Sequence, residues 1–195
     1  GDQFRIGSAR VRVLWPDASY LSLPPGNDGR ALNDRSIVLR LDVPGFSALF
    51  TGDIESDIDA HIIRNINAPV DFLKAPHHGS KGAASRALLA AADPRVSVVS
   101  VGTRNSYGHP ALETLARLAE RGAVVERTDR SGTVTITVPL GQPSQIEIES
   151  SLGIRLAPAR TAIGRRAPAA AVADAVSPTQ LSAVAVAGGG SVAEV

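Results

Sequence analysis

The sequence contains no cysteine and no methionine, and aromatic residues make up only 4% of it. The absence of cysteine excludes disulfides, thiolate metal sites and a cysteine nucleophile, but it is compatible with every cellular compartment. The formal net charge of +1 gives no strong electrostatic signature of nucleic-acid binding. No apolar run approaches the roughly 20 residues that span a bilayer, and no secretory signal opens the chain.

The absence of methionine extends to the first position, because the chain begins Gly1-Asp2-Gln3. Translation starts at methionine, so we expect either a segment of a longer protein or a processed N-terminus. In both cases we expect residues before Gly1 to matter for function.

Bulky residues are concentrated in the first part of the chain. All seven aromatic residues lie before residue 150, and the remainder is rich in alanine, proline and glycine. Such a composition lacks the large groups that offset the entropy cost of ordering. We therefore expect a folded domain over residues 1–150 and a disordered tail over residues 151–195, with transient helix around residues 169–176.

The folded part alternates strand and helix patterns, which predicts an α/β fold with layered sheets and helices. Apolar residues at helical spacing, or a proline at the first position, predict helices over residues 54–65, 85–92 and 110–121. Runs rich in β-branched residues predict strands over residues 11–15, 36–41, 48–51, 70–75, 96–101, 124–127, 133–138 and 145–149.

Three of these strands end in clusters of small and polar residues. Asp53 follows the strand at 48–51, and Lys74 and the segment 77–80 lie at the end of the strand at 70–75. The segment 102–109 follows the strand at 96–101. Since ligands bind outside the carboxyl ends of strands in layered α/β proteins, we expect a functional site where these clusters meet.

Asp53 has two interpretations. It can cap the helix that begins at Ile54, or it can point into a cleft and bridge two cations. Lys74 likewise either faces the same cleft or is an ordinary residue at the end of a strand.

His77 and His78 are candidate ligands, because imidazole is a common ligand of divalent metals. In an extended segment their side chains point in opposite directions, so only one would bind a metal directly. Gly79 permits a turn that brings the other to the substrate. The alternative is a pair of surface loop histidines. His61, on the apolar stripe of its helix, is expected to be structural.

His109 precedes Pro110 at the start of a predicted helix. A helix N-terminus favours anions, so a histidine that contacts a phosphate or donates a proton fits this position. The alternative is a histidine near the helix start that has no role. Asn105 and Tyr107 either hydrogen-bond to substrate or build the turn, and Ser80 is a further candidate catalytic residue.

Together these residues resemble the metallo-β-lactamase-fold domain of ComEC-type competence proteins, which internalise DNA across the bacterial inner membrane. The resemblance covers roughly residues 1–138 and rests on an ordered set of motifs. These are Asn33-Asp34-Arg35-Ser36, Thr51-Gly52-Asp53, Pro76-His77-His78-Gly79-Ser80, Asn105-Ser106-Tyr107-Gly108-His109-Pro110 and Arg127-Thr128-Asp129-Arg130-Ser131-Gly132.

The resemblance implies an αββα sandwich with two divalent metal ions, Zn or Mn, at one edge. Asp53 would be the metal-bridging carboxylate and His78 a ligand of the second metal. His77 would contact the phosphate, or exchange roles with His78. The ions would clamp a phosphodiester and activate a water, and His109 would stabilise or protonate the departing oxygen.

One motif of the family is missing. The fold carries a His-x-His-x-Asp-His motif that supplies most ligands of the first metal, and none of the four histidines here forms His-x-His. A catalytic zinc generally needs three protein ligands. We therefore expect the C-terminal part of a larger domain, weak metal binding and no activity in the isolated chain, and a metal-dependent hydrolase where the missing motif lies upstream.

By the same resemblance the partners would be single-stranded or transported DNA and the transmembrane channel domain of a parent protein. The domain would lie on the extracytoplasmic side of the bacterial inner membrane, with this segment itself soluble. Two other functions stay open, namely a secreted metallo-hydrolase of small esters or lactones, and a metal-free module that docks or guides DNA.

Overall fold

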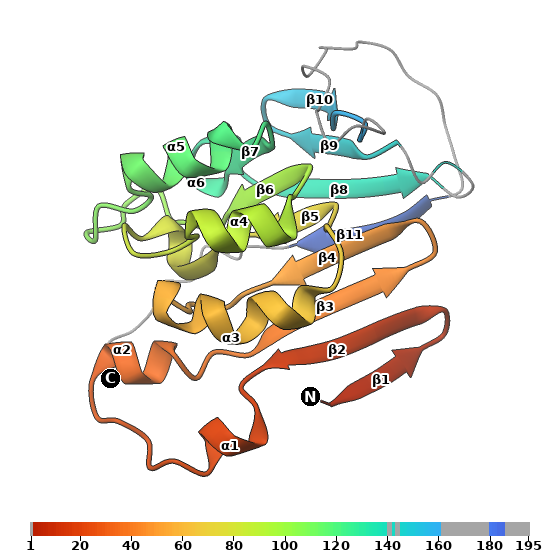
Figure 1. Cartoon of the computed structure of the whole chain (residues 1–195). Coiled ribbons are helices and arrows are strands. Elements are labelled where there is room, and N and C mark those ends of the chain that lie inside the picture. The colour runs from red at the N-terminus through yellow and green to blue at the C-terminus, as the bar shows by residue number, and fades with distance from the viewer. Residues whose placement is uncertain (1, 140–141, 143–144, 161–179, 186–195) are drawn as a thin grey trace.

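The computed structural model describes residues 2–139, 142, 145–160 and 180–185. Its strands form a seven-stranded sheet, in the order β1-β2-β3-β4-β5-β6-β7, and a four-stranded sheet, in the order β10-β9-β8-β11. Helices α3, α4 and α5 cover one face of the larger sheet (Figure 1). The described residues therefore form three layers, one of helices and two of strands, and the expected α/β fold is confirmed.

The larger sheet changes from antiparallel to parallel pairing at β4. β1 to β4 pair antiparallel, whereas β4 to β7 pair parallel. Parallel neighbours need a crossover connection, which here runs through α3 (Ser56–Ile66), α4 (Arg86–Ala92) and α5 (Leu112–Glu120). The strands are β1 (Gln3–Ile6), β2 (Ala9–Trp15), β3 (Val38–Val43), β4 (Phe46–Phe50), β5 (Phe72–Lys74), β6 (Val96–Val99) and β7 (Val124–Arg127).

One hydrophobic core lies between the larger sheet and the helices. The apolar stripe of α3 supplies Ile58, Ile62 and Ile66, spaced four residues apart so that they share one helix face. They pack with Leu49 of β4 and Leu73 of β5. These contacts fix the carboxyl ends of β4 and β5 relative to the helix that follows Asp53.

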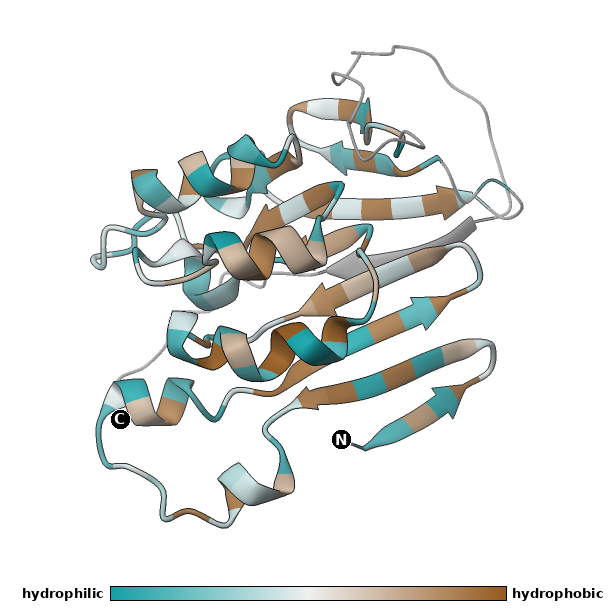
Figure 2. Cartoon of the chain, in the orientation of Figure 1, coloured by the Kyte–Doolittle hydropathy of each residue, from teal (hydrophilic) through white to brown (hydrophobic). Residues whose placement is uncertain are grey.

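A second core joins the two sheets. Phe46 and Phe72 of the larger sheet pack with Ile136 and Ile148 of the smaller one. Polar and apolar residues alternate along β8 (Figure 2), as expected for a strand with one buried face. The strands of the smaller sheet are β8 (Val134–Pro139), β9 (Glu147–Ser150), β10 (Gly153–Leu156) and β11 (Gln180–Ala185).

The smaller sheet extends the fold beyond residue 150, where the composition predicts a tail. β10 pairs with β9, Ala157 is buried, and Arg95 Nε donates to the carbonyl of Pro158 at 2.8 Å. Residues 151–158 are thus ordered by backbone pairing and one arginine rather than by bulky side chains. The predicted transient helix at residues 169–176 lies outside the described residues.

The predicted strands and helices agree with the structure to within a few residues, whereas β11, which lies in the predicted tail, and the short elements were not predicted. β1 gives no alternating pattern because each of its residues is exposed. The other short elements are α1 (Ala18–Leu21), α2 (Gly29–Asn33), the 3-10 helix η1 (Pro76–Gly79) and α6 (Thr128–Ser131). No helix in the described part of the chain is both long and apolar enough to cross a membrane.

Candidate functional site

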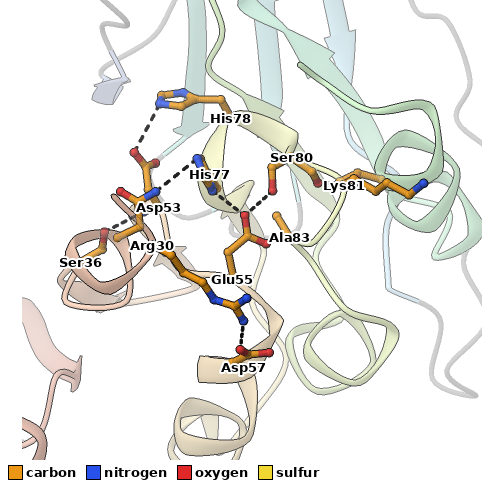
Figure 3. A network of polar contacts seen from close by, with 12 residues as sticks. Arg30, Ser36, Asp53, Glu55, Asp57, His77, His78, Ser80, Lys81 and Ala83 are labelled. Atoms are coloured by element: carbon orange, nitrogen blue, oxygen red, sulfur yellow. Dashed lines mark hydrogen bonds and ion pairs between the residues drawn. The ribbon is translucent and has the colours of Figure 1, made fainter. Parts of the chain in front are cut away.

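The site lies where the three parallel strands β4, β5 and β6 end. Asp53 follows β4, His77 and His78 follow β5, and His109 lies in the loop after β6. The His77 ring centroid is 6.3 Å from that of His78 and 5.5 Å from that of His109. The parallel pairing therefore brings these sequence-predicted residues together, and Figure 3 shows Asp53, His77 and His78 among them.

Asp53 is held at its backbone and directed by its neighbours. Its N–H donates to Ser36 Oγ at 3.0 Å, and a Cβ on Gly52 would lie only 2.5 Å from Ser36 Cβ. One carboxylate oxygen of Asp53 lies 3.4 Å from His78 Nε2 and the other 3.5 Å from Lys74 Nζ. The hydrogen bond from His78, aided by Lys74, lowers the pKa of Asp53 to about 2, so the carboxylate is ionised at neutral pH.

The structure contradicts the first of the two interpretations of Asp53, that of a helix cap. Helix α3 begins at Ser56, and Glu55 occupies its N-cap position without a side-chain capping bond. Asp53 therefore does not cap the helix and lies in the site.

The histidine pair does not adopt the extended backbone assumed for it. His77 has φ 41° and His78 has φ 49°, in the left-handed region that non-glycine residues rarely occupy. Each such residue costs on the order of 1–2 kcal/mol, so the surrounding contacts must hold it in place. The His77 N–H donates to the Gly52 carbonyl at 3.1 Å, and the Ser80 N–H donates to the His77 carbonyl at 2.8 Å. As a result both imidazoles lie at the same edge of the sheet.

His78 is oriented by a backbone carbonyl. Its Nδ1 donates to the Ser100 carbonyl at 2.6 Å, which turns Nε2 toward Asp53. The hydrogen bond to Asp53 is the main cause that raises the pKa of His78. Without a proton on Nε2, two acceptor atoms would face each other there, so a proton or another cation belongs between them.

His77 is oriented by Glu55, a residue that sequence reasoning did not select. His77 Nδ1 lies 2.5 Å from Glu55 Oε1, which also accepts a bond from Ser80 Oγ at 2.6 Å. On the other edge of the ring, Asn33 Nδ2 donates to His77 Nε2 at 3.4 Å. A Cβ on Gly82 would clash with Glu55 Oε2, so a larger residue there would displace the carboxylate.

Ser80, proposed as catalytic, is buried and bonded to Glu55. In the structure its hydroxyl therefore supports Glu55. The sequence signal that could have found Glu55 is its position two residues after Asp53 in Thr51-Gly52-Asp53-Ile54-Glu55.

Asn105 builds the turn that carries His109. Its amide donates to the carbonyls of Gly102 and His109, at 3.2 and 2.8 Å, and its Oδ1 accepts from the His109 N–H at 3.0 Å. Burial, with a further contribution from the charge of His77, lowers the pKa of His109.

Lys74, partly buried, donates to the Gly52 carbonyl at 3.1 Å, and burial lowers its pKa.

These residues do not by themselves fit a complete metal centre. Asp53 and His78 face each other as one carboxylate and one imidazole, whereas His77 Nδ1 is bonded to Glu55. Within the described ranges, no group of three or more His, Asp or Glu side chains could hold a metal ion. A catalytic zinc site generally has three protein ligands, so further ligands would be required.

Comparison with known proteins gives relatives of this segment. The chain is 32% identical to ComE operon protein 3 of Bacillus subtilis (strain 168) over 135 residues, which are 69% of this chain and 16% of that protein. It is 33% identical to Competence protein ComA of Neisseria gonorrhoeae over 130 residues, 65% of this chain and 19% of that protein. These relatives support a competence-protein family.

The similarity to competence proteins concerns a small part of their length. The chain also matches the uncharacterized protein YcaI of Escherichia coli (strain K12), with 26% identity over 70% of this chain and 17% of that protein. It thus spans less than a fifth of each of these three relatives. No protein-family profile matches the chain.

Proposed function

We propose that this chain is part of a metallo-β-lactamase-like domain of a competence protein that takes up and processes DNA as a metal-dependent phosphodiesterase or nuclease. The names of two relatives support a role in competence. The helix, sheet and sheet layers match an αββα sandwich without its second helical layer. The remaining length of such a protein would supply a transmembrane channel domain, with this domain on the extracytoplasmic side.

The observation that carries the proposal is the convergence of an ionised Asp53 with three histidines at the ends of parallel strands. Asp53 Oδ2 lies 3.4 Å from His78 Nε2, and the Lys74 ammonium lies 3.5 Å from Asp53 Oδ1. A phosphodiester is an anion, and such fixed charges and donors can bind and orient it. Glu55 fixes the orientation of the His77 ring, whose centroid lies 6.3 Å from that of His78 and 5.5 Å from that of His109.

His109 would act on the departing oxygen. Its lowered pKa keeps the imidazole neutral near pH 7, so it donates a hydrogen bond more readily than it transfers a proton. Of the two roles that the resemblance implies, stabilisation is therefore favoured over protonation.

Dependence on two divalent ions, Zn or Mn, is part of the proposal, but it needs ligands besides Asp53 and His78. The 195-residue chain alone is accordingly expected to bind these ions weakly and to be inactive. Tight binding of two ions to this chain would contradict that expectation.

The function is tested by cleavage of labelled single-stranded DNA. The chain is expressed alone and together with any residues encoded before Gly1, with Mn or Zn added. We expect the longer protein to cleave DNA and Asp53→Ala to reduce cleavage to background. The matched control is Asp57→Ala, because Asp57 is exposed and pairs with Arg30 outside the site. Cleavage by the Asp53→Ala variant would contradict the role of Asp53 as the metal-bridging carboxylate.

A metal-free DNA-guiding module is the second candidate, and Lys74 favours it. Its ammonium already lies beside Asp53, where it offsets the charge that would attract a cation. Single-stranded DNA binding that needs no metal, with no cleavage by the longer protein, would support this candidate over the first.

A further inference from the structure

The loop between β6 and α5 presents an exposed aromatic ring beside the site. Tyr107 is 82% exposed, the highest value among the exposed large hydrophobic side chains of the described residues. Its ring is stacked on that of His109, with the centroids 6.0 Å apart and the planes inclined by 18°. A row of rings therefore runs from His78 through His77 and His109 to Tyr107 at the surface.

The shape of this loop does not require the tyrosine. Asn105 closes the loop through its bonds to Gly102 and His109. Gly108, with φ 72°, supplies the turn just after Tyr107. Since the loop is built by these neighbours, the exposed ring is available for another role.

The same loop carries a positive charge. Arg104 is exposed and forms no ion pair with a described residue. Sites for single-stranded nucleic acid combine cations that follow the phosphate backbone with aromatic rings on which bases stack. The loop thus carries one group of each kind, and its aromatic ring is stacked on His109.

We infer that Tyr107 is a base-stacking subsite for single-stranded DNA, with Arg104 contacting a phosphate of the same strand. This inference rests on the proposed function, because it names the part of the substrate that lies beside the reacting phosphodiester. Tyr107 would hold the base of a neighbouring nucleotide, while the histidines contact its phosphate. Stacking tolerates any base, since every base has a flat face, so the subsite would favour single strands without reading their sequence.

Fluorescence anisotropy with the 195-residue chain tests the subsite. The probes are a labelled single-stranded oligonucleotide and a strand of equal length that is abasic at every position, both without added metal. Stacking on one ring predicts that Tyr107→Ala weakens binding of the intact strand about five-fold to 150-fold. Tyr107→Phe keeps the wild-type affinity, and binding of the abasic strand does not change.

Leu112→Ala is the matched control, because Leu112 is 79% exposed and lies at the start of α5. It is expected to bind both strands like the wild type. If the wild type binds both strands equally, or if Tyr107→Ala weakens both equally, the stacking subsite is overturned while DNA binding stands. If neither strand binds, the proposed function fails and the subsite fails with it.

Discussion

Glu55 and His77 are joined by the shortest contact in the site, with Oε1 2.5 Å from Nδ1. The same oxygen accepts the Ser80 hydroxyl, and the Glu55 side chain is only 16% exposed. One carboxylate thus holds a ring from the strand end and a hydroxyl from the following turn. This contact explains how His77 keeps its orientation although its backbone lies in a rarely occupied region.

Removal of the Glu55 carboxylate is expected to destabilise the fold. Glu55→Ala leaves His77 Nδ1 and Ser80 Oγ without an acceptor, which costs about 1–3 kcal/mol when such groups are buried. Urea unfolding measures the loss. Glu113→Ala is the control, since Glu113 is exposed and its ion pair with Lys81 lies at the surface, and it should lose no measurable stability. Equal stability of the two variants would argue against the role of Glu55.

Gly82→Ala is expected to displace Glu55 while the protein still folds. The new Cβ would lie 2.2 Å from Glu55 Oε2, the flexible end of a side chain that can move. The imidazole nitrogen signals of His77 in NMR spectra should therefore shift, whereas those of His61, which packs on Trp15, should stay.

Gly102→Ala is the matched control for this variant, because its Cβ would meet nothing within 4 Å. Its His77 signals should equal those of the wild type. Unchanged His77 signals in Gly82→Ala would mean that Glu55 does not orient the ring.

The buried carboxyl group of Asp59 is expected to make the free energy of unfolding depend on pH. The residue is buried in α3, its Oδ2 accepts from the Ser85 N–H at 3.3 Å, and its Oδ1 has no partner among the described residues. Burial raises its pKa to about 6. From about pH 4 to pH 6 the folded state keeps a proton that the unfolded state releases. Stability therefore falls as pH rises, by at most on the order of 2–3 kcal/mol.

Urea unfolding at about pH 4.5 and about pH 7 measures the effect, because the folded state keeps the Asp59 proton at the first pH and has released it at the second. Asp59→Asn should flatten the fall, because the amide does not titrate. Asp57→Asn, an exposed position in the same helix, should keep the wild-type slope. The assignment would be contradicted if both variants kept that slope.

The core elements could be predicted because their signals are local. The four-residue spacing of Ile58, Ile62 and Ile66 is visible in the sequence and gives α3 directly. β1 could not be found, since none of its residues is buried. β10 was missed because pairing with β9 and the bond from Arg95 to Pro158 order it, and neither leaves a local pattern.

The residues of the site could be predicted from the sequence better than the contacts between them. Asp53, His77, His78 and His109 meet because neighbouring strands end together, which a strand pattern can indicate. The choice between a helix cap and a site residue depended on distant partners of Asp53. Glu55 was missed for the same reason, since its contacts lie more than twenty residues along the chain.

Histidine NMR gives the most direct test of whether DNA binds at the ends of β4, β5 and β6. A single-stranded oligonucleotide is added to the metal-free chain, and the imidazole signals of all four histidines are followed. We predict that the signals of His77, His78 and His109 move together, while those of His61, which packs on Trp15, do not. Oligonucleotide binding that leaves the three site histidines unchanged would contradict this prediction.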